Sequence, residues 1–175
     1  YIVGGTESAP TQLVVFDPAT NVIVAQHDLD GGYVYDTAGY ANLAAVLVNA
    51  AADDWNPRIR VIDVNTGATV FTRAFEFAIA DLAVNANYLA LLIVDISVWR
   101  LQLYDLATGE LVDDFDSAGV RAITMSAKYL VGVCADGEAG EWQGTPGGGV
   151  DVYRVLPTGL SYMRTDRVFP PFGVR

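Results

Sequence analysis

The sequence predicts an all-β chain made of repeated units, each with four short antiparallel strands. Three observations support this prediction: apolar and polar residues alternate with a period of two in many short segments, one strand–turn–strand pattern occurs four times, and no segment has convincing helical periodicity. A mixed α/β domain is therefore disfavoured. A β-sandwich with regularly spaced strands is the alternative that these patterns leave open.

The repeated pattern joins two strands through a tight turn. Its first half alternates between apolar and polar residues, which predicts a half-buried strand, and its Thr-Gly or Thr-Asn predicts a turn because Gly and Asn tolerate positive φ. In three copies an aspartate stands three residues before the turn threonine, where its carboxylate can accept hydrogen bonds from turn amides or hydroxyls. The copies cover residues 13–24, 59–70, 101–112 and 150–161, and their turn residues are Asp17 and Thr20, then Asp63, Thr66 and Gly67, then Asp105, Thr108 and Gly109, and finally Thr158 and Gly159.

A second landmark, a tyrosine followed by an apolar strand, lies between these hairpins. It occurs at residues 1–5, 40–48, 88–92 and 129–133. The segments before the last two tyrosines are rich in small and branched residues, which suit an inner strand packed near a central axis. Each unit therefore consists of an inner strand a, strands b and c, the Thr-Gly turn and an outer strand d.

The period of the repeat indicates the architecture. The turn threonines Thr20, Thr66, Thr108 and Thr158 are separated by 46, 42 and 50 residues. Four short antiparallel strands in about 40 to 50 residues is the period of a β-propeller blade. We therefore expect a single β-propeller region over residues 1–175, with blade units at approximately 1–39, 40–87, 88–128 and 129–175.

The units resemble blades of WD40-like β-propeller proteins. Asp-x-x-Thr-Gly is a common blade-end pattern of that group, and Phe16-Asp17, Ile62-Asp63 and Tyr104-Asp105 take the position of its Trp-Asp pair. The similarity covers essentially the whole chain, with two departures: no Gly-His dipeptide precedes an inner strand, and Arg154 replaces the aspartate in the fourth unit. The resemblance implies a non-catalytic scaffold that binds other proteins, within a larger assembly.

The register of the repeat places both ends of the chain within one type of blade. Tyr1 aligns with Tyr129, just after strand a, and residues 173–175 align with residues 119–121, early in strand a. We therefore expect these residues to be an excerpt of a longer propeller. A four-bladed ring, or an oligomer that completes a larger ring, is the alternative.

Composition argues against several classes of function. The net charge is −11 and the sequence pI is about 4.2, which disfavours nucleic-acid binding because phosphate contacts need clustered Lys and Arg. No apolar run reaches the roughly 18 residues of a membrane helix, so we expect no membrane insertion. A single cysteine and the lack of an Asn-x-Ser/Thr sequon favour a reducing compartment, and we expect an intracellular, cytoplasmic protein.

Few residues could support catalysis. His27 is the only histidine and lies on a predicted outer strand, and Cys134 lies on a predicted strand b among apolar residues, where burial is expected. Neither a nucleophilic triad nor a histidine metal site can be assembled from them, so we expect no enzyme activity, no cofactor and no metal. Asp81 falls within a predicted inner strand, where it could line a channel or pair with Arg121 of the next unit.

The alternative is an enzyme propeller of the quinoprotein-like group, or another ligand-binding propeller, whose site lies in further blades. Asp-x-x-Thr-Gly is also the repeat pattern of quinoprotein-like blades. Those blades usually place a tryptophan after the turn, whereas residues 68–71 and 110–113 contain none. This difference favours the scaffold.

The loops between strands b and c and between consecutive units share one rim of a propeller, because its strands alternate in direction. Two of these loops place carboxylates beside a tryptophan, which suits a basic or aromatic-seeking segment of a partner protein. The other interpretation is solvated loops whose tryptophans fold back on blade edges. The spacing of the acids does not match an EF-hand calcium loop. The candidate partner-binding residues are Asp53, Asp54 and Trp55 in one loop and Asp136, Glu138, Glu141 and Trp142 in the other.

Overall fold

A computed structural model describes most of the chain, namely residues 2–4, 11–29, 32–49, 57–95, 98–117, 119–134 and 149–167. Every regular secondary-structure element in these ranges is a β-strand, and the strands form four antiparallel sheets. Within these ranges no helix has the length and apolar character needed to cross a membrane.

The four sheets follow one another in chain order. The first contains β1 (Ile2–Gly4), β2 (Gln12–Asp17) and β3 (Val22–Asp28). The second contains β4 (Tyr33–Tyr40), β5 (Leu43–Asn49), β6 (Arg58–Asp63) and β7 (Thr69–Ala74). The third contains β8 (Ala78–Val84), β9 (Tyr88–Asp95), β10 (Val98–Asp105) and β11 (Leu111–Asp116). The fourth contains β12 (Val120–Met125), β13 (Tyr129–Cys134), β14 (Gly149–Leu156) and β15 (Gly159–Arg167).

These sheets confirm the expected all-β fold of four-stranded antiparallel units. Three sheets have four strands, and the first has three among the described residues. In each complete sheet consecutive strands are hydrogen-bonded neighbours, so the chain runs from one edge of the sheet to the other in the order a, b, c, d. The third and fourth sheets begin with an inner strand that precedes the landmark tyrosines Tyr88 and Tyr129.

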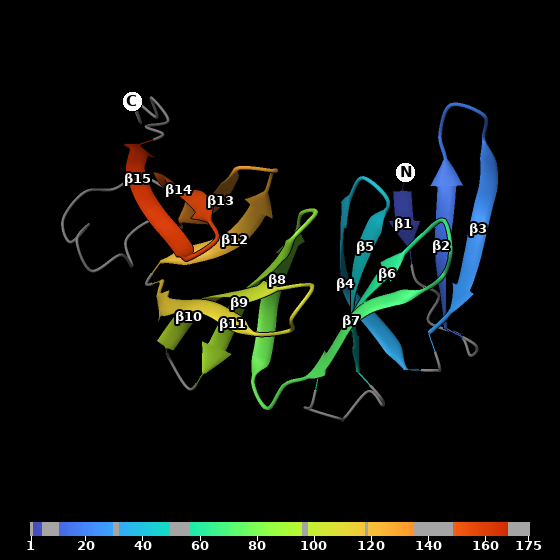
Figure 1. Cartoon of the computed structure of the whole chain (residues 1–175), viewed down its shortest axis with the longest axis horizontal. Coiled ribbons are helices and arrows are strands. Elements are labelled where there is room, and N and C mark those ends of the chain that lie inside the picture. Colours follow the sequence, from blue (N-terminus) through green and yellow to red (C-terminus); the bar gives the residue numbers. More distant parts are fainter. Residues whose placement is uncertain are drawn as a thin grey trace, which may run out of the picture.

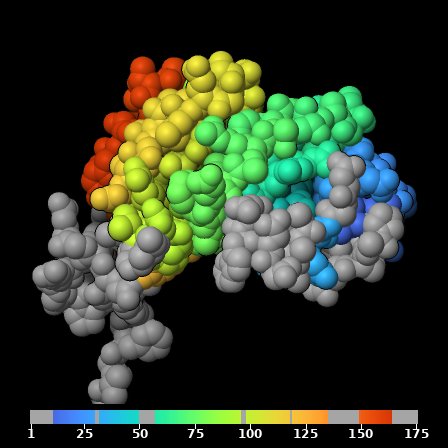
Figure 2. All heavy atoms as spheres, turned by 90° about the horizontal axis from the view of Figure 1, so that it is seen from below, coloured from blue at the N-terminus to red at the C-terminus, as the bar shows by residue number. Residues whose placement is uncertain are grey.

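The sheets lie side by side (Figures 1 and 2), with their colours in chain order from blue to red. The inner strands β4 and β8 contact one another, and so do β8 and β12. The outer strands β11 and β15 also make contact. The sheets are therefore stacked face to face, with their inner strands grouped around one axis.

Each inner strand of the three complete sheets has a β-bulge at the same repeat position. The pairing register with the next strand shifts by one residue there. A bulge turns the side chains that follow it in a new direction, so it decides which side chain faces the axis. The residues left out of register are Tyr35, Ala80 and Arg121, and the residues that follow them are Asp36, Asp81 and Ala122.

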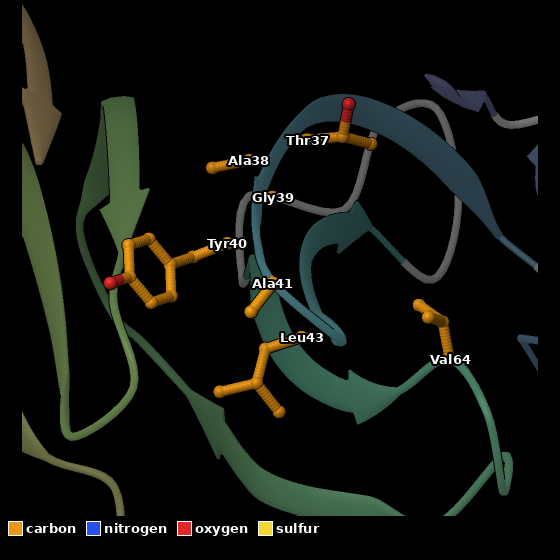
Figure 3. Close-up of a pocket in the computed structure, with 7 residues that line it drawn as sticks. All are labelled: Thr37, Ala38, Gly39, Tyr40, Ala41, Leu43 and Val64. Carbon is orange, nitrogen blue, oxygen red and sulfur yellow. The ribbon is translucent and has the colours of Figure 1, made fainter. Parts of the chain in front are cut away.

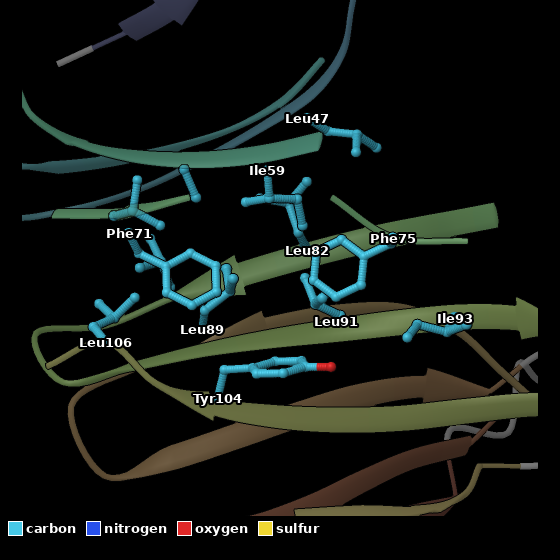
Figure 4. Packing of buried hydrophobic residues seen from close by; sticks show 13 residues of the cluster. Leu47, Ile59, Phe71, Phe75, Leu82, Leu89, Leu91, Ile93, Tyr104 and Leu106 are labelled. Carbon is cyan, nitrogen blue, oxygen red and sulfur yellow. The ribbon is translucent and has the colours of Figure 1, made fainter. Parts of the chain in front are cut away.

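Three apolar layers form the core, one between each pair of neighbouring sheets. We call the face that a sheet turns toward the following sheet its trailing face, and the opposite face its leading face. Between the second and third sheets, Leu47 and Ile59 of a trailing face pack with Leu89, Leu91 and Tyr104 of a leading face (Figure 4). These five side chains are at most 4% exposed. Burial of this apolar surface is the main force that holds the sheets together.

Candidate functional site

A groove lies at the axis, where the inner strands β4, β8 and β12 meet. Its volume is about 260 Å³, and it is lined by residues 37–39, 81–84 and 123–125. Ala38, Gly39 and Ala83 have no atom beyond Cβ, so space remains between the strands. The groove is the part of the axis where polar and apolar groups of three sheets come together.

Asp81 brings a carboxylate to this groove. The carboxylate accepts a hydrogen bond from the Leu82 amide at 2.8 Å and one from the Ile123 amide of the next sheet at 2.6 Å. Charge-assisted bonds of this kind are stronger than bonds between neutral groups. Asp81 therefore links the inner strands of the third and fourth sheets through a hydrogen bond.

Asp36 occupies the equivalent position in the second sheet, and its carboxylate accepts a hydrogen bond from the Thr37 amide at 2.8 Å. Burial raises the pKa of Asp36. The charge of Asp81 and a hydrogen bond to its side chain raise this pKa further, although backbone amides of Thr37 and Leu82 act in the opposite direction. The two carboxyl groups thus form an interacting pair at the axis, in which Asp36 holds a proton more readily than an ordinary aspartate does.

Arg121 stands at the bulge of the fourth sheet's inner strand. Its guanidinium lies over the ring of Trp99, 4.1 Å from the ring centroid. A cation over the face of a tryptophan is attracted by the ring quadrupole. The structure therefore gives Arg121 an aromatic partner, while Asp81 lines the axis and binds the Ile123 amide.

A second hollow of about 290 Å³ lies at the turn from β4 to β5 (Figure 3). Its described lining residues are 37–41, 43 and 64, and none of these carries a charge. Tyr40 extends toward the third sheet, on the side away from Val64. The hollow therefore offers shape and a few backbone groups, whereas the axial groove offers the Asp81 carboxylate.

The turn aspartates bind the turns that follow them. Asp63 accepts hydrogen bonds from the amides of Asn65 and Thr66 at 2.9 and 3.1 Å. Bonds from backbone amides favour the ionised carboxylate, and the Ala19 amide is the main cause of a lowered pKa at Asp17. The equivalent bonds are made by Asp105 with the amides of Ala107 and Thr108, and by Asp17 with the Ala19 amide and the Thr20 hydroxyl.

The residue after each turn threonine has positive φ. It is Asn21 at 58°, Gly67 at 74° and Gly109 at 74° in the first three sheets, and Gly159 at 130° in the fourth. The fourth turn differs from the others because Arg154 takes the place of the aspartate, and Leu156 pairs with Gly159 across a two-residue connection through Thr158.

The outer strand of each of the first three sheets reaches the turn region of the following sheet. These contacts hold the sheets together at their outer edges, as Asp81 does at the axis. In the second sheet, the cation of Arg73 also lies over the Tyr104 ring at 4.9 Å. The contacts are His27 Nε2 to the Val64 carbonyl (3.0 Å), Arg73 to the Gly109 carbonyl (3.4 Å) and the Leu160 amide to the Asp113 carboxylate (2.7 Å).

Cys134 is buried at the end of β13, as its sequence environment predicts. Its Sγ lies 3.4 Å from a carboxylate oxygen of Asp151. Burial raises the pKa of the Cys134 thiol to about 12, and the negative charge of Asp151 adds to the effect. The thiolate is the reactive form, so this cysteine is a weak nucleophile at neutral pH.

The seven predicted partner-binding residues lie outside the described residues. The described strand ends on either side of them lie on one rim: β5 ends at Asn49 and β6 begins at Arg58, and β13 ends at Cys134 and β14 begins at Gly149. Four acidic residues stand at the same rim, at strand ends or in connections that the structure describes: Asp28, Glu76, Asp95 and Asp116. Within the described ranges, no group of three or more His, Cys, Asp and Glu is placed to hold a metal ion.

Sequence reasoning missed the structural roles of Asp36 and Asp113. Asp36 has a usable signal, because an aspartate follows the apolar residue of the inner strand by two positions both at Val34 and at Ile79. Asp113 has none, because its partner Leu160 lies 47 residues away and no aspartate stands at the equivalent position of the other outer strands.

No protein-family model matches the chain, and no curated protein does. Solved structures do match. Hsv2 from Kluyvelomyces marxianus aligns with a TM-score of 0.62 and 11% identity, over 96% of this chain and 59% of that chain. The β-propeller domain of the Trilobed protease from Pyrococcus furiosus aligns with a TM-score of 0.57 and 13% identity, over 81% of this chain and 44% of that one.

The acylaminoacyl peptidase of Pyrococcus horikoshii aligns with a TM-score of 0.56 and 13% identity, over 81% of this chain and 26% of the peptidase. This chain therefore spans less than two thirds of each of these structures. Identities this low establish the fold and leave function open. The fold of the described residues is a partial β-propeller of stacked antiparallel sheets.

Proposed function

We propose that this chain is a non-catalytic interaction module of WD40-like type, which binds another protein through its acidic loop rim. The observation that supports this proposal is the structural use of the side chains that could otherwise do chemistry. His27 bonds to a backbone carbonyl, Cys134 is a buried thiol, and Asp63 and Asp81 bind backbone amides. Each of these groups therefore makes a structural contact within the chain.

Charge supports the choice of partner. The chain carries a net charge of −11, and the described part of the rim contributes Asp28, Glu76, Asp95 and Asp116. Arg58 and Arg167 also stand at strand ends on this rim. An excess of carboxylates attracts a partner segment of positive charge and speeds their encounter. A Lys- or Arg-rich segment that also presents an apolar or aromatic side chain to Trp55 and Trp142 has the matching chemistry.

Binding of a short Lys-rich peptide that contains one leucine tests the rim. Titration calorimetry of the whole chain should give saturable binding that weakens as salt is added. The double variant Asp53→Asn with Asp54→Asn, and the variants Trp55→Ala and Trp142→Ala, should each weaken it. Glu110→Gln is the matched control, because Glu110 is exposed beside a turn at the opposite rim. Binding that is unchanged in all the rim variants would exclude these loops as the site.

An absorbance spectrum tests the enzyme alternative. A quinone or other coloured cofactor that copurifies in a one-to-one ratio would overturn the non-catalytic proposal. The proposed location is the cytoplasm, supported by a single cysteine that is buried and by the lack of a glycosylation sequon. Fractionation of the source cells checks it.

A further inference from the structure

The turn rim, which carries the a–b and c–d turns opposite the loop rim, departs from the repeat in the fourth sheet. In the second sheet, Nδ2 of Asn42 in the a–b turn donates a hydrogen bond to the carboxylate of Asp63 before the c–d turn, at 2.6 Å. Strand pairing places Lys128 at the position of Asn42 and Arg154 at the position of Asp63. Two cations therefore replace an amide and a carboxylate that bind one another.

The backbone of these turns is the same in both sheets. The Val64 amide donates to the Asn42 carbonyl at 2.8 Å in the second sheet, and the Val155 amide donates to the Lys128 carbonyl at 2.9 Å in the fourth. Arg154 directly precedes Val155. The two cationic side chains therefore start from neighbouring backbone positions, and side chains at the equivalent positions are close enough to form a hydrogen bond.

The described part of the chain provides no anion for these cations. Lys128 and Arg154 are both exposed, and neither side chain makes a hydrogen bond or an ion pair with another described residue. Two like charges at neighbouring positions repel each other. An anion bound between them would remove this repulsion. The pair is also unusual in composition, because Lys128 is the only lysine in a chain of net charge −11.

A carboxylate is the anion that this position accommodates. Each of the first three sheets has an aspartate where the fourth has Arg154, so a carboxylate belongs to this point of the repeat. Elsewhere in the chain, Arg100 donates from Nε and Nη2 to both oxygens of the Asp114 carboxylate, at 2.9 and 2.7 Å. An arginine binds a carboxylate through such a fork, and a lysine adds a second point charge.

We propose that Lys128 and Arg154 bind an acidic segment of a partner protein, with one carboxylate on the guanidinium and a neighbouring one on the ammonium group. Two adjacent acidic residues match the two positive charges. This site goes beyond the proposed function, because it lies on the opposite rim and shares no residue with it. The net charge of the chain is negative, so the attraction is local and added salt weakens it.

Lys128 gives a direct readout of binding, because isotope-labelled lysine marks one side chain in the whole chain. Titration with a glycine-flanked Glu-Glu peptide should shift its NMR signal to saturation, and the Gln-Gln peptide should not. Arg154→Gln should weaken binding roughly tenfold or more, since a charge-assisted hydrogen bond is lost. Arg58→Gln, which removes an exposed cation at the start of β6 on the loop rim, is the matched control and should bind like the unmodified chain.

A double variant tests the site without the lysine signal. Lys128→Asn with Arg154→Asp recreates the pair of the second sheet, so it should stay folded by circular dichroism and lose peptide binding in calorimetry. The proposal is overturned if the peptide leaves the Lys128 signal unchanged, or if Arg154→Gln binds as tightly as Arg58→Gln. Inorganic phosphate that binds more tightly than the peptide would assign the site to a phosphate group and overturn the choice of a carboxylate.

Discussion

Among single side chains, aspartate performs most of the structural work that polar residues do in this chain. Asp63 and Asp105 bind turn amides, and Asp81 binds the amide of Ile123 in another sheet. A carboxylate that accepts bonds from backbone amides is stabilised without a cation. This use of acids explains how a chain with few lysines and arginines can keep its aspartates in ordered positions.

Removal of the Asp81 carboxylate should destabilise the fold. Asp81→Ala leaves the partly buried Ile123 amide without its acceptor, which costs about 1–3 kcal/mol of the free energy of unfolding. Asp81→Asn should cost less, because its amide oxygen can still accept that bond. Urea denaturation measures both, and equal stability of Asp81→Ala and the unmodified chain would show that the bond between the sheets contributes nothing.

The axial carboxyl pair should make stability depend on pH. The pKa of Asp36 is raised by burial and by Asp81, so its contribution to stability is fully present below the unfolded pKa and is lost as the pH rises through the folded pKa. The variant Asp36→Asn does not ionise. Its urea midpoint, relative to that of the unmodified chain, should therefore increase from about pH 4 to about pH 7. Asp28→Asn, at an exposed rim position, is the control, and the same pH dependence in both variants would contradict the role of the pair.

At the level of strands and turns, the local pattern of the sequence was sufficient for much of the structure. The alternation of apolar and polar residues and the turn preference of Thr-Gly depend on only a few neighbouring residues. Strands such as β6 and β10, and the order of strands within a sheet, could therefore be predicted. Contacts between sheets could not be predicted in this way. Asp113 meets Leu160 and His27 meets Val64 only because of how one sheet is rotated on the next, and strand patterns contain no information on that rotation.

The two central turns allow the strain of a turn to be separated from its contact with the neighbouring sheet. Gly67 and Gly109 have the same φ of 74°, but a Cβ at Gly67 would lie 2.7 Å from His27 Nδ1, whereas the nearest atom at Gly109 is 4.0 Å away. Gly109→Ala should lose about 1–2 kcal/mol through backbone strain alone. Gly67→Ala should lose more, and the excess should disappear in a His27→Ala background. Thermal or urea denaturation of the four variants measures this, and an equal loss at both glycines would show that His27 is not packed on the turn.

Equivalent positions in the third and fourth sheets should differ in their importance for stability. Leu92→Ala opens a cavity in a fully buried layer and should cost about 2–5 kcal/mol. Val133→Ala, at the same repeat position but 47% exposed, should cost less than about 1 kcal/mol in dilute solution. Denaturation at low protein concentration compares the two variants. A large loss at Val133 would mean that residues of the same chain already cover this face.

For the whole molecule, the repeat predicted the stacking of similar sheets, and the solved structures of propellers agree with it. The positions of the partner loops could not be derived in the same way. Residues 53–55 and 136–142 lie in connections that differ in length from one unit to the next, so the repeat provides no template for them. The proposal that these residues bind a partner therefore rests on their residue types, namely acids placed beside tryptophans.

Hydrogen exchange tests whether the stacking of one sheet on the next protects the strands of this fold. The amides of β9 and β10, which are covered by the fourth sheet, should exchange more slowly than those of β13 and β14, where Val133 is 47% exposed. Protection of β13 and β14 that matches that of β9 and β10 would contradict this account.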